Sequence, residues 1–67
     1  MSDFDYLAAK NKAVKKAGGT NELARKLGIS PSAVSQWKKV PSGRVLKLEG
    51  LTSMRRSEIR PDLYPEE

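Results

Sequence analysis

The sequence contains no cysteine and no histidine. Their absence excludes disulfides, zinc sites built on those ligands, and catalysis by a thiol or an imidazole. The 67 residues leave room for a single domain over residues 1–67, and a domain of this size buries only about 60% of the surface that its unfolded chain exposes. Such a small core needs a further source of stability, so we expect a homodimer, and we expect no cofactor.

Long apolar runs are also missing. None approaches the roughly 18 to 20 residues that cross a bilayer, and the first residues, Met-Ser-Asp-Phe-Asp, are acidic where a secretion signal is basic and then apolar. We therefore expect a cytoplasmic protein that has no membrane partner. The acidic residues are scattered, and the sequence shows no nucleophile–base pair and no phosphate-binding glycine loop, which argues against an enzyme.

Positive charge is concentrated in the first part of the chain. Residues 1–40 carry eight Lys or Arg against three acidic residues, whereas residues 41–67 carry five of each. A basic surface in the first part suits a polyanion, because neutralised phosphates dominate the non-specific affinity for nucleic acid. Charge alone leaves a second interpretation open, which is an ordinary solvated surface.

The spacing of apolar residues predicts a helix over residues 5–17, whose apolar stripe includes Leu7 and Val14. An aspartate at position 3 or 5 can accept the free amides of its first turn, and the pair Gly18–Gly19 can end it. The opposite side carries lysines that we expect to be solvated, namely Lys10, Lys12, Lys15 and Lys16.

Two shorter helices are predicted next. Thr20 suits the N-cap of a helix over residues 21–27, which Gly28 can end. The pair Ser30–Pro31 then supplies an N-cap and a first helical residue that needs no amide donor. We expect this third helix to run to about Lys38.

A fourth helix and a short fifth are expected after residue 41. Pro41 makes residue 40 extended, and Ser42 can cap a helix whose apolar residues are Val45, Leu46, Leu48 and Leu51. Residues 55–59 can add one more turn, which Pro61 must stop, and residues 60–67 are expected to form an extended arm. The sequence therefore predicts an all-α fold, a small domain of four or five helices with an extended C-terminal arm.

Residues 20–39 have the spacing of a helix-turn-helix. Ala24 is small where two helices cross closely, and Gly28, four residues later, suits a sharp turn with positive φ. The remaining side of the third helix is small and polar, which suits close approach to base edges. Trp37 is expected in the core rather than stacked on a base. The side chains expected to face inward are Leu23, Leu27, Ile29, Val34 and Trp37.

This segment resembles the helix-turn-helix of the phage Cro and repressor family, a lambda-repressor-like group, and above all the YdaS-like proteins of phages and prophages. The resemblance covers residues 6–65 and is most specific where the helix-turn-helix is combined with Arg-Pro-Asp-Leu-Tyr-Pro at residues 60–65. The motifs that carry it are Ala17–Gly19, Asn21–Ala24, Leu27–Ser30, Ala33–Trp37, Val40–Pro41 and Glu58–Pro65.

Three residues depart from the family pattern. Gly43 and Gly50 stand where helix formers are more common, and Arg55 replaces a frequent capping serine. Cro relatives vary between helix and strand in this region, so the sequence leaves the shape of the C-terminal part open.

The resemblance also implies which residues contact DNA. Gln36 can make a bidentate pair with adenine, whereas a serine serves either base. Without DNA binding, these residues are an ordinary polar helix surface. The base-reading candidates are Ser32, Ser35 and Gln36, flanked by Pro31 and Lys39. The phosphate-contact candidates are Thr20, Asn21 and Ser30 at helix N-termini and the cations Lys38 and Arg44.

The implied function is transcriptional regulation by a homodimer on double-stranded DNA, as a Cro-type repressor whose operator is a pseudo-palindrome. The alternative is an antitoxin or adaptor whose main partner is another protein, held by Leu63 and Tyr64. Salt separates the two, because DNA affinity falls steeply as salt rises while an apolar protein contact barely responds.

Overall fold

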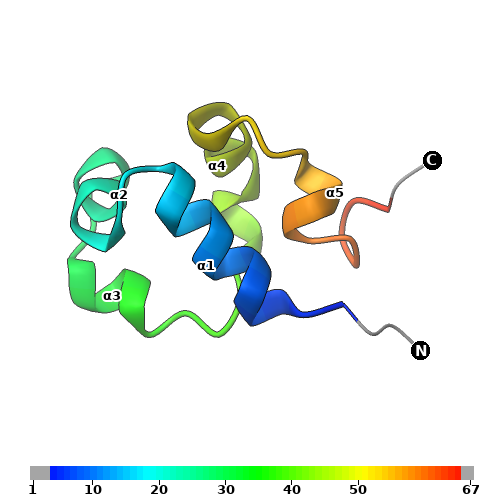
Figure 1. Cartoon of the computed structure of the whole chain (residues 1–67), viewed down its shortest axis with the longest axis horizontal. Helices are drawn as coiled ribbons and strands as arrows, with labels where there is room; N and C mark the ends of the chain where they lie inside the picture. Colours follow the sequence, from blue (N-terminus) through cyan, green and yellow to red (C-terminus); the bar gives the residue numbers. More distant parts are fainter. Residues whose placement is uncertain (1–3, 66–67) are drawn as a thin grey trace.

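The computed structural model describes residues 4–65, and every regular element in that range is helical (Figure 1). The elements in chain order are α1 (Tyr6–Lys16), α2 (Thr20–Leu27), α3 (Pro31–Ser35), the 3-10 turn η1 (Ser42–Arg44), α4 (Val45–Thr52) and α5 (Arg56–Ile59). The predicted all-α fold is confirmed. The C-terminal part, whose shape the sequence left open, is helical over α4 and α5.

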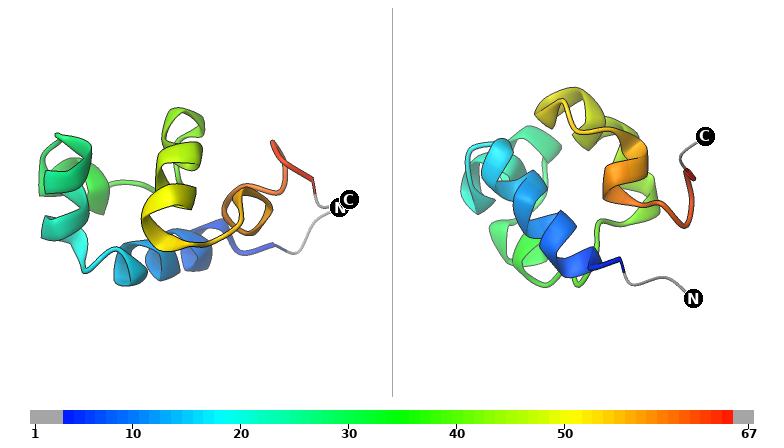
Figure 2. Two further views of the ribbon diagram at one scale, coloured as in Figure 1. Left: turned by 90° about the horizontal axis from the view of Figure 1, so that it is seen from above. Right: turned by 45° about the vertical axis from the view of Figure 1, so that its right-hand side comes forward.

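The pair α2–α3 lies at one end of the molecule. In Figure 1, α2 and α3 stand at the left, α1 and α4 lie in the middle, and α5 lies towards the right; the view from above in Figure 2 keeps the same order. Helix α1 contacts α2, α4 and α5 and so joins the two ends. The first and last described segments both lie at the end away from α2 and α3 (Figure 2).

Local sequence determines both ends of α1. The Asp5 carboxylate accepts a hydrogen bond from the Ala8 amide at 2.9 Å, which confirms Asp5 as the cap. Asp3, the other candidate, lies outside the described residues. At the far end Gly18 and Gly19 have φ values of 104° and 107°, and their amides donate back into the last turn of α1. Only glycine adopts such angles at little cost, so the predicted stop is confirmed.

A core of small and medium apolar side chains lies between the helices. Leu23, Val34 and Ile59 are fully buried and come from α2, α3 and α5. All the residues predicted to face inward from the helix-turn-helix lie in this core or against it, including Trp37. The core consists of Ala13, Val14, Ala17, Leu23, Ala24, Val34, Val40, Val45, Leu48, Met54 and Ile59, with Leu27, Ile29, Trp37, Leu51 and Tyr64 packed against it.

The packing of α1 corrects two expectations. Leu7, expected in the buried stripe, is 50% exposed, because the packed neighbours leave the first turn of α1 uncovered on that side. Lys10, expected in solvent, is only 8% exposed. It lies one turn before the buried Val14, where the aliphatic stem of a lysine can be covered. The other three lysines of this helix are exposed, as expected.

Two boundaries in the helix-turn-helix differ from the prediction. Thr20 does not cap α2; it is the first residue of the helix, and Gly19 takes the N-cap position without a side-chain bond. Helix α3 ends at Ser35 and does not reach Lys38. The reason is tertiary, because Trp37 leaves the helical path to pack against the core.

The region around α4 also differs in detail. Ser42 begins η1 and makes no side-chain cap bond, so it does not cap α4 as predicted. Within α4, Leu46 is 53% exposed whereas Val45 and Leu48 are fully buried, because the core touches only one side of the helix. The helix ends at Ser53, whose φ of 63° lies in the left-handed region.

Residues 60–65 fold back in a turn. The amides of Leu63 and Tyr64 both donate to the Arg60 carbonyl, at 3.1 and 2.9 Å. Tyr64 packs against the core, while Leu63 stays 41% exposed. The predicted extended arm is therefore wrong over this range, because Pro61 followed by Asp62 favours a turn at this point. Residues 66–67 of the predicted arm lie outside the described residues.

We predict that Ser53→Gly stabilises the protein. Ser53 is the one non-glycine residue with positive φ in the described part of the chain. A side chain in that conformation costs about 1–2 kcal/mol, and the greater freedom of unfolded glycine offsets part of the gain, so we expect about 0.5–1 kcal/mol in the free energy of unfolding. Urea unfolding at neutral pH measures it. Gly28→Ala is the reverse control, and an unchanged midpoint for Ser53→Gly would refute this account.

Candidate nucleic-acid interface

The turn between α2 and α3 sets the geometry of the site. Gly28 adopts the left-handed conformation, with φ 73°, and the Ile29 amide donates to the Ala24 carbonyl at 3.0 Å. This bond closes the end of α2 and turns the chain sharply towards α3. Ala24 is 1% exposed and lies in the core where α2 and α3 pack together. The predicted left-handed turn at Gly28 is confirmed, and Ala24 is buried as expected.

Helix α3 begins as its sequence predicts. The Ser30 hydroxyl accepts a hydrogen bond from the Ala33 amide at 3.2 Å, and Pro31 is the first helical residue. One side of the helix is fixed by the buried Val34. The structure thus presents the opposite side of a short, anchored helix to solvent. Because the Ser30 hydroxyl already accepts a hydrogen bond from the Ala33 amide, this cap bond competes with its predicted contact to a phosphate.

Four of the five base-reading candidates come together on this helix. Pro31, Ser32 and Ser35 are exposed on α3, and Gln36 is exposed at its C-cap. The Gln36 amide nitrogen donates to the Ser32 hydroxyl at 3.2 Å, so these two side chains are already paired across one turn. The group is polar and uncharged, as the sequence indicates.

Lys39, the fifth candidate, lies apart from α3. It stands in the non-helical connection to η1, and its ammonium lies over the Tyr6 ring, 5.3 Å from the ring centroid. Its charge also helps to lower the pKa of Asp62. The structure therefore directs this side chain towards the start of α1 and the C-terminal turn. It is not part of the α3 surface that carries Gln36.

The phosphate-contact candidates lie before and after α3 along the chain. Thr20 is half-buried and Asn21 exposed at the start of α2, where amides are free and the helix dipole is positive. Lys38 is exposed in the connection after α3, and Arg44 is half-buried at the end of η1.

A buried arginine, Arg60, is the part of this region that sequence reasoning missed. Arg60 is 7% exposed, and it donates to the Val40 carbonyl at 2.7 Å and to both carboxylate oxygens of Asp62 at 2.9 and 2.7 Å. Its guanidinium also lies over the Tyr6 ring, 5.8 Å from the centroid. The signal that could have found it is an aspartate two residues after the arginine across a turn-forming proline, since the planar guanidinium fits a carboxylate in a two-point pair.

Pairing of Arg60 with Asp62 shifts the pKa of both side chains. The hydrogen bonds from Arg60 lower the pKa of Asp62 from 3.8 to about 2, although burial acts in the opposite sense. The same bonds raise the pKa of Arg60 above its ordinary value, although burial acts in the opposite sense. Both groups are therefore charged at every physiological pH.

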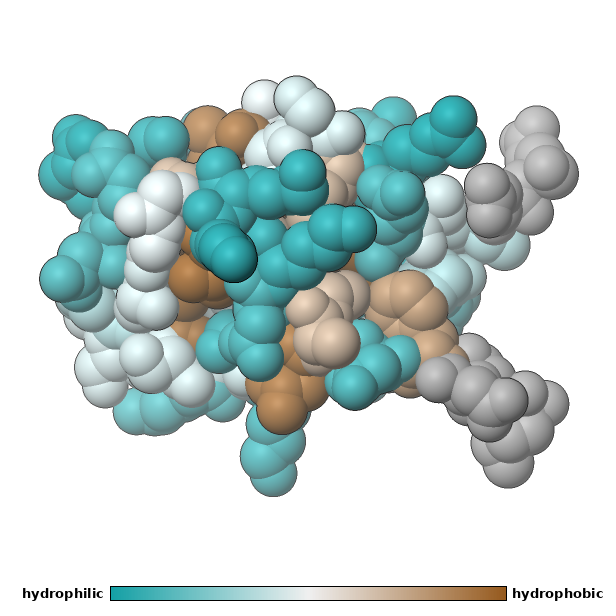
Figure 3. Space-filling model, viewed as in Figure 1, coloured by the Kyte–Doolittle hydropathy of each residue, from teal (hydrophilic) through white to brown (hydrophobic). Residues whose placement is uncertain are grey.

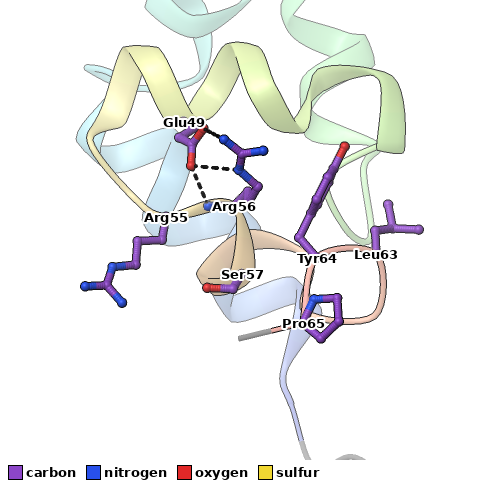
Figure 4. Close-up of a pocket in the computed structure, with 7 residues that line it drawn as sticks. All are labelled: Glu49, Arg55, Arg56, Ser57, Leu63, Tyr64 and Pro65. Atoms are coloured by element: carbon purple, nitrogen blue, oxygen red, sulfur yellow. Dashed lines mark hydrogen bonds and ion pairs between the residues drawn. The ribbon is translucent and has the colours of Figure 1, made fainter. Parts of the chain in front are cut away.

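A second ion pair joins α4 to the start of α5 (Figure 4). The Glu49 carboxylate accepts from the Arg56 side chain at 3.2 Å and from the Arg56 amide at 3.0 Å, and these bonds lower the pKa of Glu49. The Glu58 carboxylate accepts the Arg55 amide at 3.0 Å. Two carboxylates thus satisfy free amides at the start of α5, which explains how Arg55 is tolerated where a capping serine is frequent in the family.

Every acidic residue that the structure describes is engaged in a cap or an ion pair. Those residues are Asp5, Glu22, Glu49, Glu58 and Asp62. Exposed lysines of the first part of the chain are consequently opposed by no unengaged carboxylate in residues 4–65. Figure 3 shows hydrophilic side chains over much of the face drawn there. The electrostatics of the described surface favour a polyanion.

Within residues 4–65, no three Asp or Glu side chains gather in a way that could hold a metal ion. None of the described helices has the length and apolar character needed to cross a membrane.

The packed α2–turn–α3 unit within a small helical domain defines a helix-turn-helix protein. Residues 11–67 match the family described as bacterial toxin YdaS, and since the match covers most of the chain, the protein belongs to that family. The expected YdaS-like membership is confirmed. Neither the curated proteins nor the solved structures include a significant match to this chain.

We predict that the Asp62–Arg60 pair makes stability depend on pH in the acid range. Because the pKa of Asp62 falls from 3.8 to about 2 on folding, its contribution is fully present above about pH 4 and is lost as pH falls towards 2. Asp62→Asn should lower the free energy of unfolding at pH 7, and the difference from wild type should shrink between pH 4 and 2. Urea unfolding across this range measures it. Asn11→Ala is the control, since it removes an exposed side chain that carries no charge. A pH-independent difference for Asp62→Asn would be the contrary result.

Proposed function

We propose that this protein is a sequence-specific DNA-binding regulator of transcription, a Cro-type repressor of phage or prophage origin that acts in the cytoplasm on a pseudo-palindromic operator. One observation carries the proposal. Helix α3 is anchored from behind by Val34, while its outer side of Pro31, Ser32, Ser35 and Gln36 is exposed, small and uncharged. Such a surface can approach base edges in the major groove without repelling phosphate.

Gln36 is the principal base-reading residue in this proposal. The bond from its amide nitrogen to Ser32 uses one of two N–H groups and restrains the side chain. The second N–H and the carbonyl oxygen remain for the two-point pair that glutamine makes with adenine, worth about 1–3 kcal/mol of discrimination. Ser32 and Ser35 lie close enough along α3 to contact neighbouring base pairs.

Phosphate contacts supply the affinity. The free amides at the start of α2, with Thr20 and Asn21, suit one phosphate through the helix dipole. Lys38 and Arg44, which follow α3 in the sequence, supply positive charges for further phosphate contacts. The charge balance supports this role, because residues 4–65 carry 13 Lys or Arg against five acidic residues.

The proposed active form is a homodimer. A domain this small presents too few contacts to select one site in a genome, whereas two copies with reading helices about 34 Å apart can engage successive major grooves. A dimer on an operator that overlaps a promoter excludes polymerase.

Selection of bound sites from a pool of random DNA duplexes tests the proposal. We predict that the wild type recovers half-sites related by a two-fold axis and one helical turn apart. Gln36→Ala should lose preference at one base position per half-site, by about ten- to a hundredfold, because only that pair is removed. Recovery of single half-sites would contradict the dimer, and recovery of no sequence would contradict DNA reading.

Two matched variants separate reading from phosphate binding. Lys38→Ala should weaken all sequences alike and lower the salt slope of the binding constant by about one. Asn11→Ala removes an exposed amide from α1, as Gln36→Ala removes one from α3, and should leave both preference and slope unchanged. Equal effects of Gln36→Ala and Lys38→Ala on the selected sequences would refute the division of roles.

The family description favours a second candidate function, that of a toxin that inhibits bacterial growth. The two functions are compatible, because a protein that occupies promoters of the host would itself stop growth. The role of antitoxin or adaptor is less well supported, since Tyr64, one of the two residues proposed to hold a partner, packs against the core.

Induced expression in bacteria tests the second function. We predict that the wild type slows growth, that Gln36→Ala relieves the inhibition because DNA reading is lost, and that Asn11→Ala inhibits as the wild type does. Growth curves at matched protein levels are the measurement. Undiminished inhibition by Gln36→Ala would show that toxicity acts through another surface.

A further inference from the structure

We propose that Arg60 is a positioning residue for the DNA-reading helix: it fixes the chain that leaves α3 and so holds Gln36 in place. This inference rests on the proposed function. It assigns a role in DNA reading to the C-terminal turn, which lies more than twenty residues beyond α3 in the sequence.

The reading helix cannot position itself. Helix α3 has five residues, whereas an isolated helix needs about 12–15 residues even to be marginally stable. Its beginning is fixed by the Gly28 turn and the Ser30 cap. After Gln36 the chain is non-helical as far as η1, so the carboxyl end of α3 depends on tertiary contacts.

Arg60 provides a contact at that end. Its guanidinium donates to the carbonyl of Val40, four residues after Gln36, at 2.7 Å. Val40 is 1% exposed, so its carbonyl has little access to water and this bond is costly to lose. The connection from α3 to η1 is therefore anchored at its buried residue by a side chain from the end of α5.

Arg60 is itself held rigidly. Asp62 accepts two hydrogen bonds from it, at 2.9 and 2.7 Å, across the intervening Pro61. The Tyr6 ring lies 5.8 Å from the guanidinium and also faces the ammonium of Lys39, the residue before Val40. Both residues that precede Pro41 are thus bound to one cluster, Val40 through its backbone and Lys39 through its side chain.

This arrangement requires an arginine. Three N–H groups of one planar guanidinium bind the Asp62 carboxylate and the Val40 carbonyl in fixed directions. A lysine keeps the charge but presents a single ammonium, which cannot reproduce the fork. The chain offers a matched comparison in Arg56, whose guanidinium makes a similar two-point pair with Glu49 on α4 and lies over the Tyr64 ring.

The experiment compares Arg60→Lys with Arg56→Lys in the full chain. The first readout is amide hydrogen exchange in the free protein; Arg60→Lys should speed exchange at residues 36–40, and Arg56→Lys should not. The second is the ratio of affinities for the selected operator and for a scrambled duplex. We expect Arg60→Lys to lower this ratio about tenfold by loss of preorganisation, with scrambled-duplex affinity and net charge little changed.

Asp62→Asn gives a second test that does not depend on the folding of Arg60→Lys. It removes one partner of Arg60 at a position that is itself exposed, and it should also speed exchange at residues 36–40 and lower the ratio. Binding is measured below the unfolding transition of each variant, so a purely structural role leaves the ratio unchanged and overturns the proposal. Equal loss of the ratio in Arg56→Lys would also overturn it. If the wild type shows no preference for any duplex, the proposed function fails. The hydrogen-exchange measurement then still decides whether Arg60 anchors the connection between α3 and η1.

Discussion

The packing of Val34 against α2 across the Gly28 turn is the constraint on which the rest of this structure depends. A five-residue helix has too few internal hydrogen bonds to persist alone. It exists here because Leu23, Ala24 and Val34 are almost completely buried together. The turn before it also requires a residue in the left-handed backbone conformation, which Gly28 adopts. Because only one side of α3 packs against the core, the residues on its other side are not needed for packing and can be polar and uncharged.

Acidic and basic side chains have different roles in this structure. Acidic side chains stabilise the ends of α1 and α5 or pair with arginines, as Asp5, Glu58 and Asp62 do. Each of the described carboxylates takes part in a cap or an ion pair. The net positive charge is therefore carried by exposed basic side chains, while the acidic side chains remain available as caps and ion-pair partners. Arg60 likewise combines two roles: it stabilises the fold through Asp62, and it is a candidate determinant of DNA reading.

Features that depend on neighbours in sequence were predictable. The Asp5 cap, the glycine stop of α1, the Gly28 turn and the pair Ser30–Pro31 each follow from local backbone preference and hydrogen bonding. The all-α fold and the inward positions of the helix-turn-helix follow from apolar spacing. The candidate reading residues on α3 were also predictable as a group, since they are the polar positions left over once the buried ones are assigned.

The sequence by itself thus determined where α1 begins and ends, where the chain turns at Gly28 and where α3 begins, because caps and glycines act within one turn of the chain. Only the tertiary structure decided that Lys10 is covered and that α3 stops early. It also decided that Arg60 and Lys39 meet at one tyrosine ring. Each of these outcomes depends on contacts between residues far apart in the chain, and the energy of burying or pairing a long side chain there exceeds the weak local preference that the sequence displays.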